Sequence, residues 1–132
     1  MKTDEQILAE LGVASAGLLF MSESEYPFEV VRVEEAGEPA GALRRLSGAA
    51  SDEPVVTQSV EDFFRVAASE AEWRTPAERV EAKRYQALIA LLRENLKEVM
   101  AYRVGSINIQ VFLIGLSASG SWLGLSTRVV ET

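Results

Sequence analysis

Apolar residues in the first part of the chain recur with the spacing of an amphipathic helix. The residues concerned are Ile7, Leu8, Leu11 and Ala14. Positions three and four apart share one helical face, so this set indicates a buried stripe. Thr3 and Gln6 fit a capping box, in which each side chain satisfies a backbone donor at the helix start. The pattern predicts a helix that begins after Thr3 and ends near the segment Ser15-Ala16-Gly17.

Two apolar runs flank the acidic segment Ser22-Glu23-Ser24-Glu25. The run from Leu18 to Met21 is short and continuous, which predicts a buried segment. The run from Tyr26 to Val33 has the composition of a strand. One face of that strand would carry Tyr26, Phe28 and Val30, and the other Val31 and Val33. Pro27 is compatible with the first residues of a strand or with an edge strand.

The segment from Glu34 to Pro54 is rich in glycine, alanine, proline and charge. This composition predicts a long loop, with Ala42 to Leu46 as a candidate edge strand. Too little sequence precedes the segment to form a separate core. We therefore expect one domain that covers residues 1–132.

Two capping patterns begin helices in the middle of the chain. Ser59 caps the sequence SVEDFFRVA, in which the phenylalanines and a valine would supply the packing. Thr75, Pro76 and Glu78 combine a capping residue, a proline at the first helical position and the acidic residue of a capping box. They predict a helix from Pro76 to about Val99. Its buried stripe would consist of Leu88, Leu91, Leu92, Leu96 and Val99.

The last third of the chain has the period of a β-hairpin. Ile107, Ile109, Val111 and Leu113 would face a core, while Phe112 and Ile114 make the second face apolar as well. Apolar character on both faces is typical of a strand near the middle of a sheet. The segment SASGS predicts a turn around Gly120, and the strand from Trp122 to Val130 would return with Leu123, Leu125 and Val129 on one side. The pattern predicts an α+β or layered α/β/α domain around an antiparallel or mixed sheet.

The amino-acid composition limits the kinds of functional site that the protein can form. Of the 132 residues, 48% are hydrophobic, which is enough for one core. The chain contains neither cysteine nor histidine. Disulfides, thiolate catalysis and Ser-His-Asp or Cys-His sites are therefore excluded, and the commonest general base is absent. An enzyme would have to use carboxylates, lysine, tyrosine or a hard metal ion, so we expect a protein that is not an enzyme.

The formal net charge of −7 at pH 7 indicates an acidic surface. Such a surface repels nucleic acid and membranes and is attracted to basic clefts, so we expect neither nucleic acid nor a membrane as a partner. No apolar run is long enough to span a bilayer. The N-terminal sequence MKTDEQILAEL lacks the basic and apolar blocks of a signal peptide. We expect a cytoplasmic protein.

Glu23 and Glu25 are the first candidate site residues. One serine separates them, and apolar runs anchor the stretch on both sides. A solvated turn is the simplest interpretation. Carboxylates also suit magnesium or calcium and could serve a two-carboxylate hydrolase, although the sequence identifies no further ligand and no second acid.

Trp73 and the end of the sequence supply the other candidates. Trp73 lies between Glu72 and Arg74, in a turn between two predicted helices. It is either an exposed apolar anchor, of the kind enriched at interface hot spots, or a plug in the core between the helices. The sequence stops at STRVVET, directly after a predicted strand. The carboxylate of Thr132 would then project from a fixed position.

Four stretches of the sequence resemble the nuclease A inhibitor family. They are GLLFMSESEYPFEV, the EAEW turn, the Y-R-x-G segment at 102–105 and the ending STRVVET. The resemblance extends over nearly the full chain. It is strongest in residues 17–31 and 99–132 and weak in the segment from Glu34 to Pro54. It implies a three-layer α/β/α sandwich resembling the pathogenesis-related protein 1 fold, here without disulfides.

The resemblance also implies a function, the tight inhibition of a sugar-nonspecific, magnesium-dependent ββα-metal nuclease by blocking its active site. By motif match, Glu23 would pair with a nuclease arginine that otherwise holds substrate phosphate. The carboxylate of Thr132 would reach the nuclease's catalytic metal, so the inhibitor would need no metal or cofactor of its own. Glu72 and Trp73 would contribute to the same surface, with Glu25 as a further candidate contact. We expect the free inhibitor to be monomeric.

Physical chemistry agrees with such a role. Arginine binds a carboxylate bidentately, much as it binds phosphate, and two fixed carboxylates offer no bond to cut. Two alternatives stay open. One is an interaction domain on the same fold with an unrelated partner. The other, less favoured, is a divalent-metal-binding or hydrolase domain built on Glu23 and Glu25.

Overall fold

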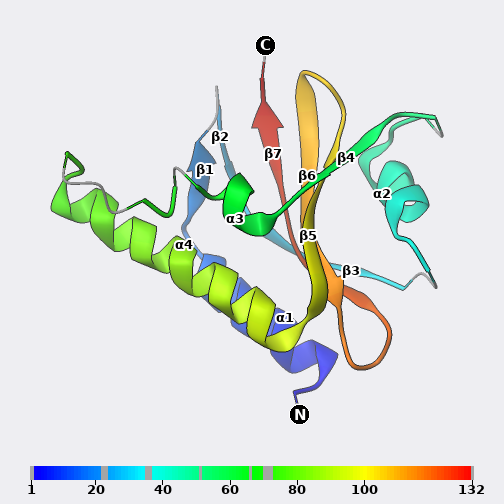
Figure 1. Cartoon of the computed structure of the whole chain (residues 1–132), viewed down its shortest axis with the longest axis horizontal. Coiled ribbons are helices and arrows are strands. Elements are labelled where there is room, and N and C mark those ends of the chain that lie inside the picture. The colour runs from blue at the N-terminus through cyan, green and yellow to red at the C-terminus, as the bar shows by residue number, and fades with distance from the viewer. Residues whose placement is uncertain are drawn as a thin grey trace.

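The computed structural model describes residues 2–21, 24–34, 37–50, 52–65, 67–69 and 73–131. The described chain contains both helices and strands (Figure 1). In chain order they are α1 (Asp4–Ser15), β1 (Leu19–Met21), β2 (Glu25–Pro27), β3 (Glu29–Val33), α2 (Ala40–Ser47), β4 (Val55–Gln58), α3 (Val60–Phe63), α4 (Pro76–Asn95), β5 (Lys97–Val104), β6 (Asn108–Leu116) and β7 (Trp122–Val130). No helix in the described part of the chain is long and apolar enough to cross a membrane.

An antiparallel sheet of five strands, in the order β3-β7-β6-β5-β4, forms the centre of the fold. The predicted closing hairpin is confirmed, because β6 pairs with β7 around the turn that contains Gly120. The central position predicted for the first hairpin strand is confirmed as well. Val111 and Leu113 of β6 face one core and Phe112 and Ile114 face another, because successive side chains of a strand point to opposite faces.

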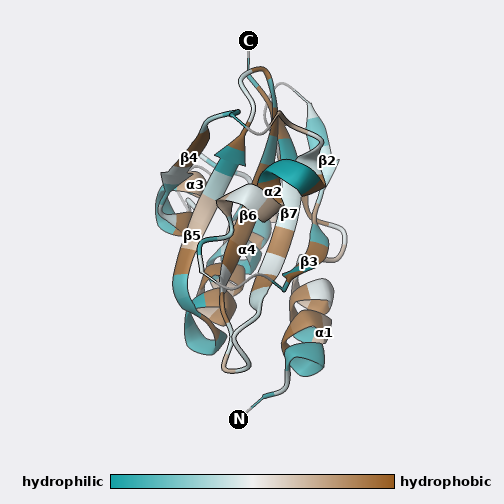
Figure 2. Ribbon diagram, turned by 90° about the vertical axis from the view of Figure 1, so that its right-hand side faces the viewer, coloured by the Kyte–Doolittle hydropathy of each residue, from teal (hydrophilic) through white to brown (hydrophobic). Residues whose placement is uncertain are grey.

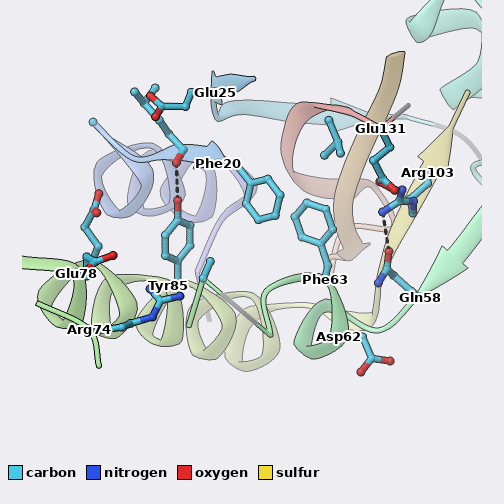
Figure 3. Close-up of a pocket in the computed structure, with 15 residues that line it drawn as sticks. Phe20, Glu25, Gln58, Asp62, Phe63, Arg74, Glu78, Tyr85, Arg103 and Glu131 are labelled. Atoms are coloured by element: carbon cyan, nitrogen blue, oxygen red, sulfur yellow. Dashed lines mark hydrogen bonds and ion pairs between the residues drawn. The ribbon is translucent and has the colours of Figure 1, made fainter. Parts of the chain in front are cut away.

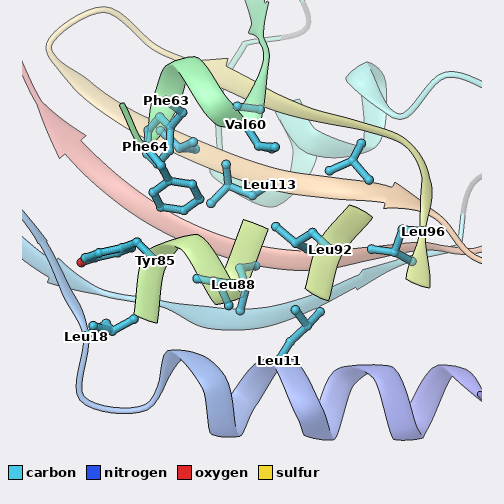
Figure 4. Packing of buried hydrophobic residues seen from close by; sticks show 14 of the residues in the cluster. Leu11, Leu18, Val60, Phe63, Phe64, Tyr85, Leu88, Leu92, Leu96 and Leu113 are labelled. Atoms are coloured by element: carbon cyan, nitrogen blue, oxygen red, sulfur yellow. The ribbon is translucent and has the colours of Figure 1, made fainter. Parts of the chain in front are cut away.

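Helices cover both faces of this sheet. The larger core lies between the sheet and the helices α1, α3 and α4, where Leu11, Leu88 and Leu113 meet (Figure 4). Helix α2 lies on the opposite face (Figure 2), where it packs beside β5 and its Leu43 joins Trp122 in a smaller core. The predicted mixed α/β class is therefore confirmed.

The predicted helix starts are confirmed by their capping contacts. The Thr3 hydroxyl accepts from the Gln6 amide at 3.2 Å, and the Gln6 side chain accepts from the Thr3 amide at 2.8 Å. Thr75 and Glu78 make the same reciprocal pair at 3.2 and 2.9 Å. Ser59 caps α3 through one such contact of 3.0 Å. Each side chain satisfies a backbone donor that has no partner within its helix.

The edge strand predicted for Ala42 to Leu46 is wrong, because this segment lies in α2. Ala42 and Leu43 are buried beneath the helix, so the period is three to four residues and not two. Gly48 ends the helix in a left-handed conformation, with φ of 73°. Glycine and alanine hid this short amphipathic pattern. Strand β4, which follows it, was not predicted.

The helix predicted from Pro76 to Val99 is four residues too long, because α4 ends at Asn95. Leu96 is already extended, and Val99 belongs to β5. Both side chains nevertheless pack in the larger core. A continuous apolar stripe therefore passes from a helix into a strand, and periodicity alone could not locate the junction.

The single strand predicted from Tyr26 to Val33 is divided at Phe28. β2 pairs with β1, whereas β3 pairs with β7 at the edge of the main sheet. Phe28 packs against the larger core and Val33 is buried in the smaller one. The chain thus leaves the β1–β2 hairpin and enters the sheet within one apolar run.

Candidate functional site

Strands β1 and β2 lie on either side of the part of the sequence that contains Glu23. Met21 pairs with Glu25 and Phe20 with Tyr26. Glu25 is exposed at the start of β2. Glu23 lies outside the described residues, as do Glu72 and Thr132. The structure therefore defines both ends of the segment that contains Glu23.

Hydrogen bonds from α4 and β7 anchor the base of the β1–β2 hairpin. The Tyr85 hydroxyl donates to the Leu19 carbonyl at 3.1 Å, and Pro27, the residue paired with Leu19, has no amide hydrogen to offer. The buried Thr127 hydroxyl donates to the Pro27 carbonyl at 3.0 Å. Both strands of the hairpin are thus tied to the body of the domain.

Arg84 and a cluster of aromatic side chains also hold the β1–β2 hairpin against the rest of the domain. The Arg84 guanidinium donates to the Ala16 carbonyl at 2.7 Å, which fixes the segment between α1 and β1. Phe20 of β1 stacks on Phe63 with ring centroids 4.5 Å apart, and Phe28 lies edge-on to Phe20 at 6.2 Å. Aromatic pairs of this kind stabilise by about 0.5–1.5 kcal/mol beyond their buried area.

Tyr85 stays protonated over a wide pH range. Burial, followed by the nearby Glu81 carboxylate, raises the pKa of Tyr85 to about 12, because both effects disfavour the phenolate. The hydroxyl therefore remains a donor to Leu19 throughout the physiological range. Nothing in the local sequence pattern around Tyr85 marks its contact with β1.

Trp73 is 84% exposed, so the interpretation of this residue as a plug in the core is wrong. It precedes Arg74 and Thr75, the residue that caps α4. A large aromatic side chain exposed to this degree is unusual. Its role as an anchor for a partner stays a prediction, and its exposure is what that prediction requires.

Glu131, the residue that follows β7, is held against the sheet. β7 runs to Val130, and the Glu131 amide donates to the Ile107 carbonyl at 2.9 Å. The Glu131 carboxylate forms an ion pair with Arg103 of β5, and Arg103 also donates to the Gln58 side chain of β4 at 3.2 Å. The predicted attachment of the last residues to a strand is confirmed as far as Glu131.

A groove of about 740 Å³ connects these three regions. Its walls include Glu25 from the hairpin, Arg74 from the turn next to Trp73, and Glu131 from the end of the chain (Figure 3). Carboxylates outnumber guanidinium groups along it. The carboxylates are Glu25, Asp62, Glu78, Glu81 and Glu131, and the guanidinium groups are Arg74 and Arg103.

The structure thus brings together the described neighbours of all the predicted contact residues. Arg103 and Gln58, which hold Glu131, carry no local sequence signal of this role. Arg103 lies in the Y-R-x-G segment, which carries part of the family resemblance but to which no contact was assigned. Its partner lies 28 positions away, and no local pattern reports such a contact.

No group of three or more acidic residues in the described ranges is arranged to hold a metal ion. The alternative metal site built on Glu23 and Glu25 is not tested by this observation, because Glu23 lies outside those ranges.

Comparison with known proteins identifies the family. The chain matches the family model described as nuclease A inhibitor-like protein over residues 5–132. No curated protein matches the chain. The family match covers both regions in which the sequence resemblance is strongest, including the hairpin segment and the ending STRVVET. Because it extends over nearly all of the sequence, the chain belongs to the nuclease A inhibitor-like family.

Proposed function

We propose that the protein inhibits a sugar-nonspecific, magnesium-dependent ββα-metal nuclease by occupying its active site. Family membership supports a nuclease as the class of partner. One structural observation carries the rest of the proposal. Glu25, Arg74 and Glu131, the described neighbours of the predicted contacts, line one groove. A single cleft on a partner could therefore meet all three regions.

Glu23 is the proposed substitute for substrate phosphate. Its carboxylate would accept two parallel hydrogen bonds from a nuclease arginine, the geometry that arginine also uses with phosphate. The anchored β1–β2 hairpin supports this role, because Tyr85 and Thr127 hold its strands before any partner binds. Preorganisation of this kind lowers the entropic cost of binding.

The carboxylate of Thr132 is the second proposed anion, directed at the catalytic metal of the nuclease. Hard divalent cations bind carboxylate oxygens well. The contacts at Glu131 support a fixed approach, since that residue is held both by its amide and by its side chain. The metal would belong to the nuclease, and the inhibitor would contribute no cofactor and no catalysis.

Trp73 and Glu72 are the proposed flank of the interface, and Glu25 an additional contact. An exposed tryptophan buries a large apolar area on binding and is common among interface hot spots. The excess of carboxylates in the groove supports a basic partner surface, as does the net charge of −7. Charge complementarity of this type speeds the encounter of two proteins.

Three broader expectations belong to the same proposal. Residues 1–132 would form one domain, monomeric when free and cytoplasmic. Helices on both faces of the sheet support the three-layer sandwich resembling the pathogenesis-related protein 1 fold. The shared larger core, which takes residues from α1 to β7, supports one folding unit.

The deciding experiment is a titration of several ββα-metal nucleases with the purified protein at fixed magnesium concentration. We expect inhibition of at least one of them, with an end point at equimolar protein. Calorimetry of the isolated protein with magnesium or calcium should show no tight site. A folded protein that inhibits none of these nucleases would favour an interaction domain with an unrelated partner, and tight metal binding would favour the carboxylate-site alternative.

A further inference from the structure

Arg103 occupies a bridging position across three strands of the sheet. It projects from β5 towards the face covered by α1 and α4, where it lies between Gln58 of β4 and Glu131 after β7 (Figure 3). One terminal nitrogen, Nη1, donates to the Gln58 amide oxygen, and the other, Nη2, pairs with the Glu131 carboxylate. The guanidinium therefore uses both sides of its fork, which a lysine could not do.

The Arg103–Glu131 ion pair differs from an ordinary surface ion pair in the strands that it connects and in the burial of Arg103. β6 lies between β5 and β7, so the pair spans two strand intervals, about 10 Å. The Arg103 side chain is only 21% exposed. Exposed ion pairs contribute little because solvent screens them and both side chains must be ordered. In the Arg103–Glu131 pair, burial of Arg103 reduces the screening by solvent. The hydrogen bond to Gln58 helps to order the Arg103 side chain.

Glu131 is the point at which the chain leaves the sheet. Its amide makes the last described backbone hydrogen bond of the β7 side, to Ile107 at 2.9 Å. A residue that follows a strand end is mobile unless other contacts hold it. The ion pair supplies such a contact on the side chain, so Glu131 is fixed at two points.

We propose that Arg103, braced by Gln58, is a positioning residue that orders the C-terminal carboxylate of Thr132 through Glu131. The proposal rests on the function proposed above for that carboxylate. Arg103 has a second effect. Because it neutralises the Glu131 side chain, the terminal carboxylate is the anion left to bind the partner's metal.

The first test is made on the free protein, so it does not depend on any nuclease. The ¹H–¹⁵N heteronuclear NOE of the Thr132 amide should be high in the original protein and low in Arg103→Met. Arg93→Met is the matched control, since it removes the same charge and a comparable ion pair, with Glu61, that lies away from the end of the chain. An unchanged NOE in Arg103→Met would overturn the proposal.

Two further variants separate positioning from stability. Glu131→Gln should lower the NOE without lowering the melting temperature, because Glu131 is exposed beyond the strand. The exchanged pair, Arg103→Glu with Glu131→Arg, should restore the NOE, because the Gln58 amide nitrogen can donate to a carboxylate. If Arg103→Met unfolds the protein, these two variants still decide the question.

The second test measures inhibition of a nuclease that the protein inhibits. Arg103→Met should raise the inhibition constant by about tenfold, the scale of ordering one terminal residue. In a protein extended by one alanine after Thr132, the same substitution should change the constant by less than about twofold, because the carboxylate is already displaced. A different result is that the alanine extension leaves inhibition unaltered while Arg103→Met still lowers the NOE of Thr132. That result would contradict the proposed role of the terminal carboxylate in inhibition, but it would support the ordering of Thr132 by Arg103. An equal loss of inhibition in both backgrounds would show that Arg103 acts elsewhere.

Discussion

The two ends of the central sheet use similar residue types for different purposes. At the serine end, which comprises the β6–β7 turn and the start of α1, the Asp4 carboxylate is only 7% exposed and accepts from Ser119 at 2.6 Å. At the groove end, where β7 finishes, Glu25 is exposed and lines an open groove. One carboxylate is enclosed by its own chain, and the other faces solvent.

The tryptophans differ in the same way. Trp122 begins β7 at the serine end, where it is buried in the smaller core and donates its indole hydrogen to the Gly37 carbonyl at 3.1 Å. Trp73 precedes α4 and is almost fully exposed. Polar and aromatic groups whose partners lie within the chain stabilise the fold, whereas similar groups without such enclosure are available to a second molecule.

The largest expected effect comes from a comparison of two single variants, in which one or the other tryptophan is replaced by alanine. Trp122→Ala should lower the free energy of unfolding by about 3–5 kcal/mol, because a large core side chain is lost. Trp73→Ala should change it by less than about 0.5 kcal/mol and weaken inhibition by about 2 kcal/mol. Urea denaturation and inhibition titrations measure the two quantities. If Trp73→Ala destabilised the protein as Trp122→Ala does, the contrast between the ends would disappear.

Glu23→Ala should weaken inhibition by about 2–4 kcal/mol, the range for one member of a desolvated charge pair. Its stability should be unaltered. Glu5→Ala removes the same charge at the serine end, where Glu5 pairs with Arg32, and is the matched control. Equal weakening by both substitutions, measured as inhibition constants at one ionic strength, would mean that net charge and not a specific pair carries the effect.

Asp4→Asn should lower stability by about 1–2 kcal/mol at neutral pH and leave inhibition unchanged. Hydrogen bonding from Ser119, opposed in part by burial and assisted by Ser117 and Arg32, holds the pKa of Asp4 below its ordinary value of 3.8. The charged form is therefore favoured by folding, and its contribution is complete above pH 3.8 and lost as the pH falls through the lower folded value. Denaturation curves between pH 7 and pH 2 should show this acid-labile component in the original protein and not in Asp4→Asn.

Tyr85→Phe has the smallest expected effect, a loss of about 1 kcal/mol from the hydrogen bond to Leu19. The pKa of about 12 gives it a second signature. Because the unfolded chain releases the phenolic proton near pH 10 and the folded chain does not, stability should decline from pH 10 towards pH 12. The phenylalanine variant should lack this alkaline component. A parallel decline in both proteins would assign it to other groups.

These contrasts also explain what the sequence could predict. Capping boxes at Thr3 and Thr75 and the two-residue period of β6 and β7 are local signals, and each element they predicted is present. The exposure of Trp73 cannot be predicted from the neighbouring sequence, because it depends on which helix packs beside the turn. The same holds for Arg103, whose partners Gln58 and Glu131 come from other strands. The error in α2 has another cause, since alanine and glycine carry little periodic information.

The order of strands makes assembly of the main sheet depend on synthesis of β7. β7 is the final strand in the sequence, yet it lies in the sheet interior between β3 and β6. Until the ribosome has released it, β3 has no neighbour in the main sheet, and Leu123 and Leu125 are missing from the larger core. Folding therefore cannot precede the synthesis of the segment that ends in Val130. Every molecule that has folded in this way therefore carries Glu131, the residue after β7, at the wall of the groove.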